Sequence, residues 1–244
     1  MRNIKLTLEY DGTEFHGFQR QRELRTVQGV LEQCFSHRLG EPIRVIGAGR
    51  TDAGVHALGQ VVNFQTTRPV PAGRLGEVLN AALPRDVKIQ GCEEVAADFH
   101  ARRCARSRTY RYSVIARRTP SPLLGRYALI VPEWPSVARM SRAARRLVGR
   151  RDFAAFRASG SHSRTTERRL LRAECRRQGD AIWMETEADS YLYQMVRNMV
   201  SALLAVGGGE MTVEEMMKAV ADGDRSGLPP PAPSCGLCLV RVSY

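Results

Sequence analysis

Two apolar periodicities alternate along this chain of 244 residues, and they constrain its fold more than any other feature. Every second residue from 4 to 10 is apolar, which predicts a half-buried strand. A helical stripe follows over residues 27–35, with Thr26 placed to cap the helix and Gly40 placed to close it. The chain therefore mixes strands with amphipathic helices from its first forty residues.

The same mixture continues through the rest of the first half. Strands are predicted at 43–46, 60–65 and 87–89, with another short one near Phe99, and a helix at 75–82 is ended by Pro84. A glycine-rich loop over residues 47–54 separates the first two of these strands. Any chemistry carried by that loop would be positioned by the strands on either side.

The second half repeats this style without visible sequence identity. The patterns predict strands at 110–114, 182–186 and 237–242, and helices with apolar stripes at 137–148 and 192–203, the latter ended by the glycines at 207–209. Thr212 and Glu215 fit a capping box for a last helix. Hairpin-like spacings outnumber strand–helix–strand units, so we expect an α+β fold with a mostly antiparallel sheet and flanking helices.

A boundary near residue 105 would divide the chain into residues 1–105, which carry the glycine-rich loop, and residues 106–244. No glycine- and serine-rich linker marks this boundary. We therefore expect two packed subdomains rather than two tethered domains.

The formal net charge of +12 and the sequence pI near 10.0 favour a polyanionic partner, and nucleic acid first. Only three of the 37 basic residues are lysines, so arginine supplies the other 34, and genomic codon bias is one alternative explanation. The distribution argues against bias alone, because 21 of the arginines lie between Arg102 and Arg177. Guanidinium groups bind phosphate in a bidentate way and stack on bases, which suits RNA.

Cysteine and histidine spacing argues against a metal site. The six cysteines are scattered, and the single CxxC, Cys235 with Cys238, lacks a second ligand pair. The five histidines lie far apart: His16, His37, His56, His100 and His162. No apolar run is long enough for a membrane span or a signal peptide, so a cytoplasmic protein with reduced thiols is expected.

The loop at 47–59, GAGRTDAGVHALG, combines glycines with one arginine and one aspartate. Glycine lets the backbone approach a ligand closely, and in an extended loop Arg50 and Asp52, two residues apart, face the same way. An arginine beside a carboxylate lowers its pKa, which suits a nucleophile better than a general acid. A phosphate-binding loop and a dinucleotide fingerprint are both excluded by the spacing. The alternative is that Asp52 merely caps a turn, the commonest role for aspartate near glycine.

The wider segment at 47–64, GAGRTDAGVHALGQVVNF, closely resembles the signature of the TruA family of tRNA pseudouridine synthases. Further family-like blocks occur in the same order along essentially the whole chain: EYDGTEFHGFQRQ at 9–21, DFHAR at 98–102, SRTYRY at 107–112, Asp152-Phe153 with Phe156-Arg157, MVRN at 195–198 and Gly236-Leu237. The resemblance implies the pseudouridine synthase fold and an isomerase that acts on tRNA.

By this resemblance Asp52 is the catalytic aspartate. It would attack the target uridine so that the bond between uracil and ribose breaks, the base rotates, and C5 rejoins C1′, without a cofactor. Only one carboxylate is conspicuous in the loop, whereas hydrolysis would usually need a second to activate water. Whether the intermediate is a glycosyl ester or a glycal stays open.

The resemblance also assigns four residues to substrate binding. Arg50 matches an arginine that pairs with the aspartate and takes the space of a flipped nucleotide, with a surface phosphate contact as the alternative. Tyr110 matches the tyrosine that packs on the target uracil, whereas Tyr112, on the same face of the strand, could be simple core. Leu237 matches an apolar residue on the other face of the uracil, and ordinary strand core is the alternative.

Arg197 is the only charged residue in the apolar stretch at 191–206. Burying an unpaired guanidinium is unfavourable, so an anionic partner is expected. The resemblance implies that this partner is Asp52, which Arg50 and Arg197 would together keep ionised.

Family resemblance further implies modification of nucleotides 38, 39 and 40 in the anticodon stem-loop of tRNA, by a homodimer. Three departures from the family pattern stand out: Phe18 replaces a usual tryptophan, Tyr191-Leu-Tyr-Gln194 replaces Phe-Leu-Tyr-His, and the chain stops soon after the last strand. They would alter RNA binding or the choice of substrate rather than the chemistry. A non-catalytic RNA-binding protein and an RNA glycosylase that releases uracil are the competing hypotheses.

Overall fold

The computed structural model describes residues 1–160 and 163–244, which form two compact units. Unit 1 contains Met1–Arg106 together with Cys238–Tyr244, and unit 2 contains Ser107–Leu237. The expected division into 1–105 and 106–244 thus differs at the C-terminal strand. Cys238 and Leu239 pair in parallel with His56 and Ala57, so this strand joins the sheet of unit 1. Apolar alternation identifies a strand but carries no information about which sheet it enters.

Unit 1 is built on a sheet with the strand order β4-β1-β3-β10, and the short β2 pairs with β3. Its strands are β1 (Arg2–Tyr10), β2 (Ile46–Gly47), β3 (His56–Thr66), β4 (Val87–Val95) and β10 (Leu237–Ser243). The β1–β3, β1–β4 and β2–β3 pairings are antiparallel. Ile4, Leu6 and Leu8 are fully buried, as their alternation in the sequence predicted.

Two helices complete unit 1, α1 (Val27–Leu39) and α2 (Ala72–Asn80). The predicted caps of α1 are confirmed, because the Thr26 side chain accepts a hydrogen bond from the Gly29 amide and Gly40 adopts a left-handed conformation. Phe35 of α1 packs on Phe64 of β3 with 5.4 Å between ring centroids. The core of unit 1 therefore lies between this helix and the sheet.

The predicted strand at 43–46 is wrong, because β2 begins only at Ile46. Ile43 and Val45 are buried, as a strand pattern requires, but their amides bond to side chains of α1 rather than to another strand. The Ile43 amide donates to the Ser36 hydroxyl, and the Val45 amide donates to the Glu32 carboxylate. A buried segment that is not hydrogen-bonded to another strand therefore has the same apolar sequence pattern as a short strand.

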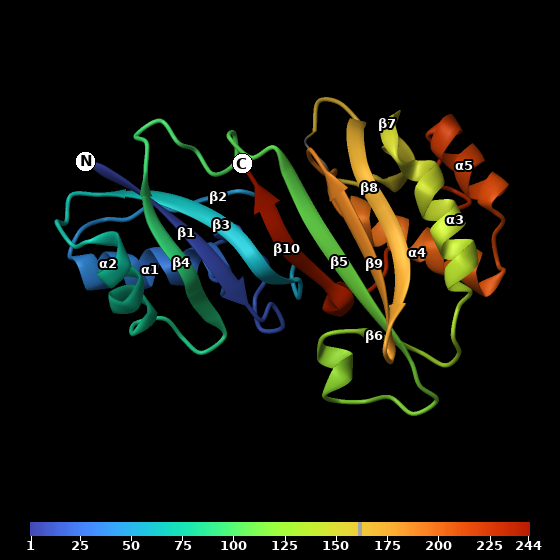
Figure 1. The fold of residues 1–244 in the computed structure, drawn as a ribbon, viewed down its shortest axis with the longest axis horizontal. Helices are drawn as coiled ribbons and strands as arrows, with labels where there is room; N and C mark the ends of the chain where they lie inside the picture. The colour runs from blue at the N-terminus through green and yellow to red at the C-terminus, as the bar shows by residue number, and fades with distance from the viewer. Residues whose placement is uncertain (161–162) are drawn as a thin grey trace. The chain divides into compact units, whose positions relative to one another are not determined.

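Unit 2 has the strand order β5-β9-β8-β7, with β6 paired in parallel to β5 (Figure 1). The strands are β5 (Ser107–Ala116), β6 (Leu129–Val131), β7 (Gly149–Asp152), β8 (Glu167–Gln178) and β9 (Ala181–Ala188), and the remaining pairings are antiparallel. The sequence did not predict β8, because most of its residues are charged and an irregularity between Leu170 and Arg172 interrupts its alternation. Only Leu170, Ala173 and Cys175 of this strand are buried.

Three helices lie along one side of the strands of unit 2 in Figure 1: α3 (Val137–Leu147), α4 (Met195–Gly208) and α5 (Val213–Asp222). Short 3-10 turns occur at η1 (Leu124–Arg126), η2 (Ala154–Phe156) and η3 (Ser234–Gly236). The capping box of Thr212 and Glu215 at α5 is confirmed, and α4 ends at Gly209 in the left-handed region. The expected α+β class is confirmed. Among the described residues, no helix is both long and apolar enough to cross a membrane.

Candidate functional site

The loop that carries Arg50 and Asp52 joins β2 to β3 within unit 1. Arg50 is exposed, Asp52 is half-buried, and Thr51 between them is buried. Residues close together in this loop therefore differ in environment. The Arg50 side chain is open to solvent, whereas Asp52, two residues later, is partly shielded from it. Whether the two side chains pair stays a prediction.

Thr51 attaches the Asp52 loop to the buried core of unit 1. Its hydroxyl lies 2.8 Å from the Tyr10 hydroxyl, and the Gln60 side-chain amide donates to the Tyr10 hydroxyl at 3.4 Å and to the Gly49 carbonyl at 2.9 Å. Tyr10 and Gln60 are buried, and burial raises the pKa of Tyr10 to about 12. The tyrosine therefore remains a neutral hydrogen-bonding group, and buried partners hold the part of the loop that precedes Asp52.

The segment before α1 holds the loop from its other side. The Phe18 amide donates to the Thr51 carbonyl at 3.0 Å, and the Gly54 amide donates to the Phe15 carbonyl at 3.2 Å. A side chain at Gly12 would place its Cβ 2.0 Å from the Val55 carbonyl oxygen, so only glycine allows this approach. The family-like block at 9–21 is thus the support of the Asp52 loop, a role that sequence reasoning did not assign.

Asp11 and His56 lie beside this support. The Gly12 amide donates to His56 Nδ1 at 3.0 Å, and the same nitrogen lies 3.2 Å from an Asp11 oxygen. His56 is buried at the start of β3. Since Nδ1 accepts from the Gly12 amide, this histidine serves the turn that supports the loop.

In unit 2, Tyr110 lies on β5 opposite Thr186 of β9 and is 8% exposed. Its ring meets Tyr191 edge-on, with 5.2 Å between centroids and an interplanar angle of 88°. The Tyr191 hydroxyl lies 3.1 Å from the Thr186 hydroxyl and 3.3 Å from the Arg108 carbonyl oxygen, and burial raises its pKa. Tyr191 therefore fixes the Tyr110 ring from the side. Sequence reasoning noted Tyr191 only as a departure from the family pattern.

Tyr112 belongs to the core, as the sequence analysis suggested for this residue. It is fully buried, and its hydroxyl donates to the Pro233 carbonyl at 2.9 Å. A side chain at Gly236 would place its Cβ 2.7 Å from the Tyr112 ring. This contact packs the segment before Leu237 against β5, and Leu237 itself is buried at the start of β10.

Arg197 lies in the first turn of α4, where the positive end of the helix dipole disfavours a cation. Its Nε donates to the Ala232 carbonyl at 2.7 Å, and the Ala232 amide donates back to the Arg197 carbonyl at 3.2 Å. This exchange fixes the direction of the side chain. Because Asp52 and Arg197 belong to different units, their pairing stays a prediction.

Among the described residues there is no group of three or more histidine, cysteine, aspartate and glutamate side chains that could hold a metal ion. His162, one of the histidines weighed as a ligand, lies outside the described residues.

Comparison with known proteins identifies the family. A family profile described as tRNA pseudouridine synthase matches residues 7–102 and 143–244. The chain belongs to the tRNA pseudouridine synthase family. The family resemblance noted in the sequence, and with it an isomerase of uridine in tRNA, is confirmed at this level.

Relatives of this synthase cover its full length. It is similar to tRNA pseudouridine synthase A of Acetivibrio thermocellus, with 41% identity over 244 residues and 100% of both chains. It is also similar to the proteins of the same name from Moorella thermoacetica, with 41% identity over 243 residues and 99% of both chains, and Azorhizobium caulinodans, with 42% identity, 100% of this chain and 95% of the relative. Tyr110 lies outside the two segments matched by the family profile but inside these alignments.

Proposed function

We propose that this synthase converts uridine to pseudouridine at nucleotides 38, 39 and 40 in the anticodon stem-loop of tRNA, with Asp52 as nucleophile and without a cofactor. The observation that carries the proposal is the half-buried Asp52 in a loop anchored by buried Tyr10, Thr51 and Gln60. An aspartate that only capped a turn would not need its neighbours held in this way. Rigid support is what a group that attacks one atom requires.

The proposed reaction is an isomerisation in which atoms and electrons balance. The bond between uracil N1 and ribose C1′ breaks, and the electron pair leaves with the base while the Asp52 carboxylate stabilises or traps the electron-poor sugar. After rotation of the base, C5 bonds to C1′, the C5 proton is lost, and N1 gains a proton. Neither an oxidant nor a second substrate is needed, and both the ester and the glycal route satisfy this balance.

Four further residues are proposed to act on the same nucleotide. The Tyr110 ring, held edge-on by Tyr191, would pack on the uracil, and Leu237 would contact its other face. Exposed Arg50 would pair with Asp52 and occupy the space of the flipped nucleotide. Arg197, aimed by Ala232, would help to keep Asp52 ionised.

Release of tritium from tRNA labelled at uridine C5 tests the proposal, because only replacement of the C5 proton releases the label. We expect the wild type to release it and Asp52→Asn and Asp52→Ala to release none while binding tRNA with unchanged affinity. Unchanged release by either variant would exclude Asp52 as nucleophile. Wild-type tRNA binding with no release would favour a non-catalytic RNA-binding protein, and free uracil would indicate a glycosylase.

The substrate position and the assembly state are tested separately. Variant tRNAs that keep uridine at only one of nucleotides 38, 39 and 40 should each be modified. We further propose a cytoplasmic homodimer, as the family resemblance implies, and light scattering coupled to size-exclusion chromatography should give twice the chain mass of 27.2 kDa. A monomer that retains full activity would exclude the dimer as a requirement.

A further inference from the structure

The exposed side of α3 carries only arginines among its charged residues. Met140, Ala143, Ala144 and Leu147 are buried against the rest of unit 2, whereas four arginines are exposed, and the helix contains no acidic residue. We call Arg139, Arg142, Arg145 and Arg146 the α3 arginine face.

The spacing of these arginines places like charges beside one another. Arg142 lies three residues from both Arg139 and Arg145 and four from Arg146, so all three are its neighbours on the helix surface. Like charges at these spacings destabilise a helix. Among the described residues, none of the four forms a salt bridge. No salt bridge to an acid within the described part of the chain therefore offsets this repulsion.

The neighbouring sheet surface is different, because two of its arginines, Arg111 and Arg172, are paired with acids. Glu185 of β9 pairs with Arg111 of β5 at 3.0 Å and with Arg172 of β8, and Arg172 also pairs with Glu174. These contacts hold the pKa of Glu185 below its usual value despite burial, through hydrogen bonds from Arg111 and Arg172. Arg111 and Arg172 are therefore balanced by acids, whereas the arginines of α3 form no salt bridge with the described residues.

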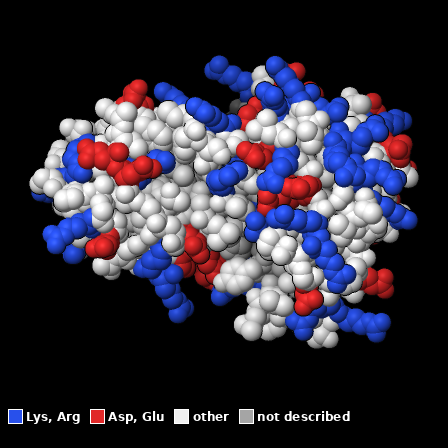
Figure 2. Space-filling model, viewed as in Figure 1, with Lys and Arg blue, Asp and Glu red and all other residues white. Residues whose placement is uncertain are grey.

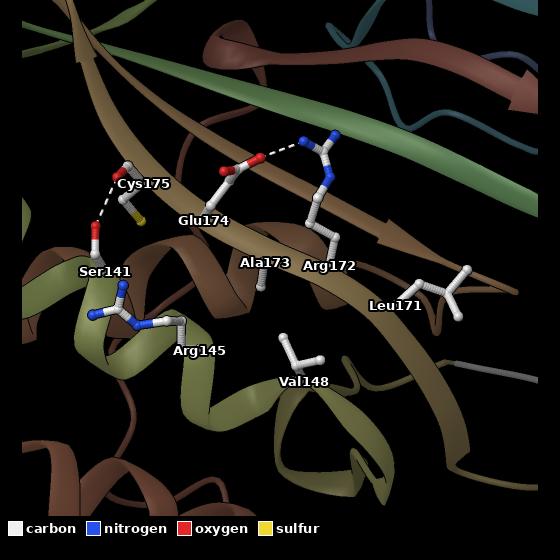
Figure 3. A pocket seen from close by; sticks show the side chains of 8 residues that line it. All are labelled: Ser141, Arg145, Val148, Leu171, Arg172, Ala173, Glu174 and Cys175. Atoms are coloured by element: carbon white, nitrogen blue, oxygen red, sulfur yellow. Dashed lines mark hydrogen bonds and ion pairs between the residues drawn. The ribbon is translucent and has the colours of Figure 1, made fainter.

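A surface hollow of about 360 Å³ is lined by residues of α3 and β8. Figure 3 shows Arg145 and Ser141 on the α3 side and Arg172, Glu174 and Cys175 on the β8 side, and the Ser141 hydroxyl donates to the Cys175 carbonyl at 2.7 Å. Burial raises the pKa of the Cys175 thiol to about 12, so it adds no negative charge to the hollow. In Figure 2, lysine and arginine side chains gather over α3 and β8.

We propose that the α3 arginine face binds the phosphate backbone of the tRNA, as a contact additional to the residues that hold the target uridine. This inference rests on the proposed function for the identity of the RNA. Four guanidinium groups on adjacent helical turns match the repeating negative charge of a nucleic-acid strand, and their phosphate contacts release counterions. The bound RNA then supplies the negative charge that α3 lacks.

Reversing one charge separates RNA binding from stability. Arg142→Glu should pair with Arg145 and Arg146 in the favourable order along the helix, so the variant should melt at the same temperature or higher. Its affinity for unmodified tRNA in a filter-binding titration should nevertheless fall about tenfold, and the slope of log affinity against log salt should decrease by about one. The single-turnover rate at saturating tRNA should not change.

Two matched variants complete the experiment. Arg118→Glu makes the same change in net charge at an exposed loop residue of unit 2 and should reduce affinity less than about twofold, since distant surface charges are screened. Arg142→Lys keeps the charge and should bind nearly as well as the wild type. If Arg142→Glu does not fold, Arg142→Ala should still lose affinity about threefold, because one phosphate contact is removed.

Equal losses in Arg142→Glu and Arg118→Glu would overturn the proposal, because bulk charge would then explain both. Unchanged tRNA affinity of Arg142→Glu would overturn the proposal as well. This holds even if the variant loses binding to anionic phosphatidylserine vesicles, because α3 would then bind a membrane surface and not RNA. If wild-type protein binds tRNA but forms no pseudouridine, the proposed function fails, whereas the binding comparison still decides the role of α3.

Discussion

The buried Tyr10, whose hydroxyl contacts Thr51 of the Asp52 loop, is the residue on which the first prediction rests. Tyr10→Phe removes the hydroxyl that contacts Thr51 and accepts from Gln60, leaving both polar groups short of a buried partner. Such a loss costs about 1–3 kcal/mol, and it should loosen the loop on which Asp52 is held. We expect kcat to fall with little change in tRNA affinity.

Tyr244→Phe is the control for Tyr10→Phe. It also removes one hydroxyl of unit 1, which donates to the Ala101 carbonyl at 2.8 Å, but this hydroxyl makes no contact with Thr51, Gln60 or Gly49. Chemical denaturation and single-turnover kinetics on both variants would compare stability with catalysis. Equal effects on kcat would mean that Tyr10 acts only through global stability.

Arg197 gives the second prediction at this scale. Arg197→Met keeps much of the apolar bulk but removes the cation and the hydrogen bond to Ala232, so activity should fall much more than tRNA affinity. Arg197→Lys should recover part of the activity, because it restores the charge but not the bond from Nε. Filter binding and tritium release measure the two effects separately. A selective loss of binding would instead assign Arg197 to RNA contact.

Secondary-structure elements were predictable where their own side chains determine them. The helix at α1 followed from its stripe and from Thr26 and Gly40, and the start of α5 followed from Thr212 and Glu215. The strand β8 escaped prediction because its apolar face is small and most of its residues are charged, with Arg172 stabilised by an ion pair to Glu185 of β9. Such pairs depend on a partner strand that sequence periodicity cannot identify.

The residues of the candidate site also fall into two groups, those that the sequence could predict and those that only the structure shows. Asp52 and Tyr110 were predicted as site residues because the segments that carry them, 47–64 and 107–112, resemble blocks of a family pattern. The supports of these residues, Tyr10, Gln60 and Tyr191, read as ordinary strand or loop residues and became recognisable only through their contacts. Contacts between residues 41, 50 and 81 positions apart leave no local pattern in one sequence.

Burial of titratable groups in both units leads to a prediction for the whole molecule. Burial raises the pKa of Tyr10 in unit 1 and of Cys175 in unit 2 to about 12 each, from ordinary values of 10.0 and 9.0. The folded protein therefore keeps protons that the unfolded chain releases at high pH. Their contribution to stability is complete below about pH 9 and is lost progressively as the pH rises toward 12.

Urea denaturation at about pH 8 and about pH 10.5 measures this loss. Cys175 alone should account for about 2 kcal/mol of the decrease in the free energy of unfolding, since each pH unit above the unfolded pKa corresponds to about 1.4 kcal/mol. Cys175→Ala should therefore show a smaller decrease than the wild type, whereas Cys104→Ala, at an exposed position, should show the same decrease as the wild type. Identical pH dependence in Cys175→Ala and the wild type would mean that this thiol does not remain protonated in the folded protein. Because Tyr10 supports the Asp52 loop, activity should decline over the upper part of the same pH range as the folded state is lost.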